Sequence, residues 1–117
     1  LEAEALRQRH ERAVLIDDLG LRAGGQPPDV VACSLGVHFD EQGQPAKAYP
    51  EFQAARARTR DRELLATCLA GVAHSGAQIG QAAEARRALE ELRVLAPDHP
   101  MLAQIEAAFR KHGLDPE

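Results

Sequence analysis

The chain has 117 residues, which gives room for one domain with a modest core and excludes a multidomain enzyme within this length. Apolar residues make up 44% of the chain and charged residues 27%, so the composition is that of a globular protein rather than a disordered one. The net charge of -4 produces no overall positive field, and nucleic acid is therefore not favoured as a partner.

Alanine supplies much of the apolar share, whereas aromatic residues account for only 3% of the chain. Alanine is the best helix former, and its small side chain lets helices approach one another closely. We therefore expect an all-α protein built from tightly packed helix pairs.

No apolar run approaches the length of a membrane span, and the two cysteines, Cys33 and Cys68, are too few for a disulfide framework. We expect a protein that does not insert into a membrane, and we place it in the cytoplasm. The chain begins at Leu1 with no signal-type segment. Two alternatives stay open: a processed protein, for which the periplasm is the second compartment, and an excised piece of a longer chain.

Residues 1–27 predict a charged N-terminal helix followed by a linker rich in Gly and Pro. The apolar residues within 2–22 recur raggedly at helical spacing, and Gly20 is expected to fray the end of this helix. The segment fits no repeat register. Three roles stay open for it: a divergent repeat helix, a docking helix that fills a groove of the remaining chain, and a linker to another domain.

Residues 29–42 predict a second helix. Asp29 follows two prolines as a candidate N-cap, and Gly43 suits the position just after a helix end. Val30 and Val31 would also suit a strand, but the apolar residues that follow them recur at the spacing of a helix, which decides for the helix.

Four further helices are predicted in the remaining chain. The third helix runs from Pro45 to about Arg58, and Pro50 inside it should kink it or delay its start. Residues 63–75 and 81–95 form another pair, separated by a break at 76–80, and residues 101–112 form a last helix that ends at Gly113.

Two of these helix pairs share one pattern of small and large apolar residues. In a unit that begins at Asp29, the pattern comprises Ala32, Leu35, Gly36, Phe39, Gly43, Ala48, Phe52 and Ala55. In a unit that begins at Ala66, it comprises Leu69, Val72, Ala73, Gly80, Ala85, Leu89, Leu92 and Pro97. Small residues suit the close crossing of two paired helices, and the large residues fill the space around that crossing.

This pattern resembles the tetratricopeptide repeat (TPR) family, in its bacterial form, from Asp29 to about Gly113. The resemblance implies antiparallel helix-turn-helix repeats in a TPR-like superhelix, with units at about 29–62 and 66–99 and a capping helix at about 100–113. Residues 28–117 then form the repeat domain. The sequence departs from the family at Arg60, where Pro is usual, and at Gly76, where a bulky residue is usual. Three extra residues also separate the units, so we expect an irregular pitch.

The resemblance further implies that the first helix of each unit lines a concave groove for a peptide or helix of a partner. The groove residues it selects are Val30, Cys33, Ser34, Val37, Asp40 and Glu41 from the first unit, and Thr67, Ala70, Gly71, His74, Ala77 and Gln78 from the second. They are small and weakly polar and lack the Lys, Arg and Asn with which chaperone-binding relatives clamp a carboxylate. We therefore expect an apolar segment to be held by shape and burial.

The predicted function is that of a noncatalytic protein-protein interaction module or scaffold, and the protein is not expected to be an enzyme. Its partner would be another protein or another domain of its parent chain. Self-association is also open, because two units with one cap bury little continuous core. No cofactor is expected.

The alternative function is anion or RNA binding through a basic patch formed by Arg56, Arg58, Arg60 and Arg62. The arginines also have a structural interpretation: cations stabilise a helix C-terminus, and Glu51, Asp61 and Glu63 would neutralise them locally. The absence of aromatic residues between the arginines also weakens RNA binding.

Two kinds of chemistry are considered and not favoured. Cys33 and His74 could form a nucleophile and base, but no orienting group accompanies them. A disulfide between Cys33 and Cys68 is not expected, because the two residues occupy different repeat positions that point apart. The five histidines, His10, His38, His74, His99 and His112, show no metal-ligand spacing, and no metal is expected.

Overall fold

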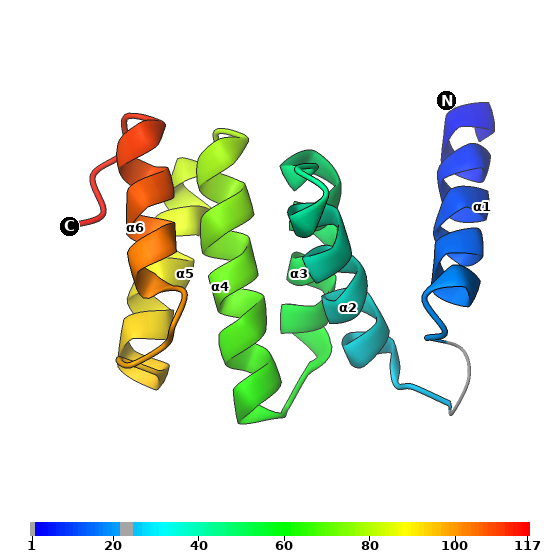
Figure 1. Ribbon diagram of the computed structural model, residues 1–117, viewed down its shortest axis with the longest axis horizontal. Helices are drawn as coiled ribbons and strands as arrows, with labels where there is room; N and C mark the ends of the chain where they lie inside the picture. Colours follow the sequence, from blue (N-terminus) through cyan, green and yellow to red (C-terminus); the bar gives the residue numbers. More distant parts are fainter. Residues whose placement is uncertain (1, 22–24) are drawn as a thin grey trace.

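The computed structural model describes residues 2–21 and 25–117. Within these ranges every regular element is an α-helix, which confirms the all-α prediction. In chain order the helices are α1 Glu2–Asp18, α2 Pro28–Glu41, α3 Pro45–Arg58, α4 Arg62–Gln78, α5 Ala82–Leu95 and α6 Leu102–Lys111 (Figure 1). None of them is long and apolar enough to cross a membrane.

The helix boundaries follow the local signals in most places. α1 stops before Gly20, which has a positive φ of 70°, and Gly43 and Gly80 adopt positive φ values of 69° and 84° at the turns after α2 and α4. Glycine adopts this conformation without the penalty that a Cβ imposes. Asp61 caps α4 by accepting a hydrogen bond from the Leu64 N–H at 3.0 Å.

Three boundary predictions need correction. Asp29 is not the N-cap of α2, because the helix already begins at Pro28, where the fixed φ of proline suits a first helical residue. α3 begins at Pro45 and continues through the exposed Pro50, so its start is not delayed. α4 continues through Gly76, since one helical glycine costs only about 1 kcal/mol and this one is buried against Tyr49 and Ala85.

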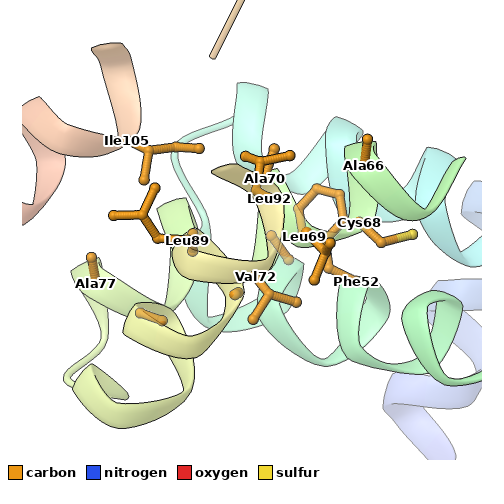
Figure 2. Packing of buried hydrophobic residues seen from close by; sticks show 14 of the residues in the cluster. Phe52, Ala66, Cys68, Leu69, Ala70, Val72, Ala77, Leu89, Leu92 and Ile105 are labelled. Atoms are coloured by element: carbon orange, nitrogen blue, oxygen red, sulfur yellow. The ribbon is translucent and has the colours of Figure 1, made fainter. Parts of the chain in front are cut away.

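Two antiparallel hairpins, α2 with α3 and α4 with α5, stack side by side, and α6 packs against α4 and α5 at one end (Figure 1). α4 contacts α2, α3, α5 and α6 and is the central helix of the stack. One continuous core runs through it, with buried residues that include Ala48, Leu69, Ala73, Ala85, Leu89, Leu92, Ile105 and Phe109 (Figure 2). The alanine positions predicted for close helix crossings are thus buried.

The ring of Phe52 lies where α2, α3 and α4 meet. A Cβ built on Gly36 of α2 would lie 2.7 Å from the ring, and a Cβ built on Gly71 of α4 would lie 2.5 Å from it. Since real Cβ atoms do not approach an aromatic ring so closely, only glycine fits at either position. The ring therefore sets how closely α2 and α4 approach each other.

α1 stands at the other end of the stack, beside α2 and α3 (Figure 1). None of its residues is buried, and Leu6 is 60% exposed. Its main attachment is a bidentate ion pair in which the Arg12 guanidinium donates to both carboxylate oxygens of Glu51 on α3, at 2.8 and 3.0 Å. This contact raises the pKa of Arg12.

Candidate binding face

The predicted groove residues lie on α2 and α4, which contact each other along the stack. Val37 and Glu41 are exposed, and Val30, Ser34, Asp40, Thr67, His74 and Gln78 are half-buried. We call the surface formed by these eight residues the α2–α4 face.

Four predicted groove residues are buried instead of exposed, and for them the prediction of an accessible position is wrong. They are Cys33, Ala70, Gly71 and Ala77. The three residues of α4 are buried because this central helix is covered by neighbouring helices on several sides. The ring of Phe52 also occupies the space beside Gly71. The accessible part of the face is therefore narrower than the sequence indicates.

A polar contact joins the two helices across this face. The Nδ1 atom of His74 on α4 lies 3.1 Å from a carboxylate oxygen of Asp40 on α2, and both side chains are largely buried. With its proton on Nδ1, the imidazole donates to the carboxylate, while the Gln78 amide donates to the His74 backbone carbonyl at 3.1 Å. The contact fixes the position of α2 relative to α4. Both residues were predicted from the sequence as groove residues, but their pairing was not predicted. The one sequence feature that indicates the pairing is the separation of the two residues along the chain, which is close to the repeat length.

The charge of the two helices is predominantly negative. α2 contains Asp29, Asp40 and Glu41 and has neither Lys nor Arg. α4 carries Glu63 and a single cationic side chain, Arg62, whose guanidinium donates to the backbone carbonyl of Leu95 at 3.1 Å. Within the α2–α4 face, Asp40 and Glu41 carry carboxylates; Asp40 is paired with His74, and Glu41 is exposed.

The four arginines of the predicted basic patch have different surroundings. Arg56 is held by Glu91 at 2.8 Å and by Glu84 at 3.7 Å, both from α5. The Arg62 guanidinium donates to the backbone carbonyl of Leu95, the last residue of the same helix. Arg58 and Arg60 are exposed and form no ion pair with the described residues. Two of the residues predicted to neutralise the patch have other partners: Glu51 pairs with Arg12 of α1, and Asp61 caps α4.

Cys33 and His74 are not brought together. His74 pairs with Asp40, whereas Cys33 is a buried free thiol. Cys68 is likewise a buried free thiol, and both cysteines belong to the core. Among the described residues, no group of three His, Cys, Asp or Glu side chains is placed to hold a metal ion.

Two clefts border α1. The larger, of about 810 Å³, lies between α1 and the first hairpin, where it is lined by Phe39 of α2 and by Ala46, Lys47, Pro50 and Glu51 of α3. The second, of about 570 Å³, lies between the end of α1, the start of α2 and α3. No predicted groove residue lines either cleft, so α1 does not fill the α2–α4 face.

Because α1 buries no residue, we expect removal of residues 1–26 to leave α2 to α6 folded and helical. Truncation removes the Arg12–Glu51 ion pair and the partial cover that α1 gives to α2 and α3. These losses should lower the melting temperature by no more than about 5 °C. Circular dichroism of the full and truncated chains measures this, with light scattering to follow the mass in solution. A truncated chain that is unfolded, or that forms oligomers, would mean that α1 is part of the core.

Comparisons with family models, with curated proteins and with solved structures found no match to this chain.

Proposed function

We propose that this chain is a noncatalytic interaction module of the tetratricopeptide type, which holds a peptide or helix of a partner protein, or of another domain of its parent chain, on the α2–α4 face. The observation that carries the proposal is the side-by-side placement of α2 and α4, which are held by the ring of Phe52 and by the His74 to Asp40 contact. Two helices fixed in this way present a preformed surface, which lowers the entropic cost of binding.

The chemistry of the face favours a partner segment that is both apolar and basic. Val30 and Val37 offer apolar contact, and the small side chains of Ser34 and Thr67 leave room for a neighbouring backbone. The exposed carboxylate of Glu41 stands at the end of α2, and no cationic side chain of α2 opposes it. Complementary charge on the partner would steer encounter and select the partner, while apolar burial supplies most of the affinity.

Anion or RNA binding through the basic patch receives less support. Arg56 is already paired with two carboxylates, and Arg62 is engaged with a backbone carbonyl. Arg58 and Arg60 are exposed and unpaired among the described residues, and two guanidinium groups without an aromatic neighbour form a weak site for a nucleic acid.

A selection of random peptides displayed on phage against the full chain tests the proposal. We expect the enriched peptides to combine apolar residues with Lys or Arg. The substitutions Val37→Arg and Glu41→Lys should each weaken binding of the synthesised peptides by about tenfold or more, since both place a cation where the partner's cations lie. The matched controls are Val94→Arg and Glu90→Lys on α5, which are exposed residues of the same types and should change binding little.

The proposal fails if enriched peptides bind equally to the Val37→Arg variant and its Val94→Arg control. It also fails if no peptide is enriched while polyuridylate RNA binds with a steep dependence on salt that Arg58→Ala and Arg60→Ala remove. That second result would establish the alternative function.

A further inference from the structure

The larger of the two clefts beside α1 is a surface that the proposed function does not use. Its volume of about 810 Å³ falls within the range of about 300–1,000 Å³ that is typical of small-molecule sites in proteins. α1 leaves this space open, because none of its residues is buried while Arg12 reaches across to Glu51 on α3. No residue of the α2–α4 face lines the cleft, so the two surfaces are separate.

Part of the cleft lining is apolar. These residues come from α1, α2 and α3 and comprise Ala5, Val14, Leu15, Phe39, Ala46 and Pro50. Val14 and Pro50 are exposed and Phe39 is half-buried, so apolar surface on all three helices is open to water. A ligand with an apolar body would remove this surface from water, which is favourable.

Two cations of the lining have no carboxylate partner among the described residues. They are Arg9 on α1 and Lys47 on α3, both exposed. The ammonium group of Lys47 lies 5.9 Å from the centre of the Phe39 ring. Arg12, by contrast, is neutralised by Glu51. The cleft therefore offers uncompensated positive charge beside its aromatic residue.

The two cations lie at the same end of the cleft. α1 and α3 run in the same direction (Figure 1), and the Arg12–Glu51 pair joins them at one level. Arg9 lies one helical turn before Arg12 on the same face of α1, and Lys47 lies one turn before Glu51 on the same face of α3. Both cations therefore stand about one turn from the ion pair, on the same side of it.

The lining also contains three carboxylates, those of Glu11, Asp18 and Glu51. Glu51 is paired with Arg12, and a carboxylate oxygen of Glu11 lies 3.9 Å from the Nε atom of Arg7. Asp18 comes almost two turns after Arg12 on α1, which places it toward the opposite end of the cleft from the two cations. An anion bound beside the cations is therefore not opposed by an unpaired carboxylate at that end.

We propose that this cleft binds a single-chain amphiphile with a carboxylate head, of the fatty-acid type. The carboxylate lies between the guanidinium of Arg9 and the ammonium of Lys47, and the alkyl chain covers Phe39, Pro50 and Leu15. Both cations bind a carboxylate through charge-assisted hydrogen bonds, which are stronger than neutral ones. The site is independent of the proposed function, since it shares no residue with the α2–α4 face.

The lining favours this ligand over two others. A small polar anion such as phosphate would contact only two exposed cations, whose attraction is screened by water and salt, and it would leave the apolar lining uncovered. An amphiphile with a cationic head would be repelled by the same two cations. A carboxylate on an apolar chain uses both parts of the lining.

Isothermal titration calorimetry of the full-length protein with decanoate tests the proposal, at neutral pH and below the concentration at which decanoate forms micelles. The matched ligand is decan-1-ol, which has the same chain without the charge. We expect decanoate to bind with a dissociation constant below about 1 mM and about tenfold more tightly than decan-1-ol.

A double variant with Arg9→Gln and Lys47→Gln should weaken decanoate binding by about tenfold and leave decan-1-ol binding unchanged, because it removes the charge and keeps the apolar lining. The matched control carries Arg110→Gln and Lys111→Gln at the end of α6, where both residues are exposed at the other end of the stack (Figure 1). It loses the same charge and should bind decanoate as the wild type does. Circular dichroism checks that both variants keep their helices.

Three results would overturn the proposal. The first is no binding of decanoate up to about 1 mM. The second is equal binding of decanoate and decan-1-ol by the wild type, which would leave the two cations without a role. The third is an equal loss of decanoate binding in the two double variants, which would show a response to net charge and not to this cleft.

Discussion

Replacement of Phe52 with alanine is expected to lower the free energy of unfolding by about 3–5 kcal/mol. The Phe52 side chain is 2% exposed and fills the space in which α2, α3 and α4 meet, where both neighbouring helices carry glycine. Neither Gly36 nor Gly71 has a side chain that could move into the cavity, so the loss cannot be offset by local repacking. Unfolding in urea, followed by circular dichroism, measures the change.

Phe39→Ala is a suitable control for this substitution. Phe39 is half-buried at the edge of the core and borders the cleft beside α1, so its removal leaves no closed cavity. We expect a loss smaller than that of Phe52→Ala by about 2 kcal/mol or more. Equal losses for the two variants would contradict the central place of the Phe52 ring.

Gly71→Ala is expected to destabilise the protein by about 1–3 kcal/mol, although alanine is the better helix former by about 1 kcal/mol. The added Cβ would lie 2.5 Å from three atoms of the Phe52 ring. The ring is enclosed by the core and cannot move aside without shifting α3 or α4. Packing therefore outweighs helix propensity at this position. The same urea experiment gives the sign and the size of the effect.

Gly76→Ala provides the matched control within α4. Its added Cβ would lie 3.1 Å from Tyr49 and 3.2 Å from Ala85, a tight but milder contact. It should destabilise less than Gly71→Ala. In addition, Gly71→Ala should cost less in a Phe52→Leu background than in the wild type, because the smaller side chain leaves room for the new methyl group. If the stability effects of the two substitutions simply add in the double variant, the Phe52 ring is not the group that clashes with the added methyl group.

The sequence alone determined the helices and their pairing. The apolar spacing within 29–42 selects a helix over the strand that Val30 and Val31 suggest, and glycines such as Gly43 and Gly80 mark the turns at which the structure has positive φ. These signals are local, because hydrogen bonds within a turn and the conformations open to glycine depend on neighbouring residues. The candidate face on α2 and α4 was also selected from the sequence, through the phase of the two units.

Only the tertiary structure decided which of these side chains are accessible and which of them meet. It buries Cys33, Ala70 and Gly71, joins His74 to Asp40, and places α1 at the end of the stack through Arg12. Each of these outcomes depends on how closely two helices from distant segments approach and at what angle. That geometry follows from the summed packing of many side chains around the Phe52 ring, and no local pattern encodes it.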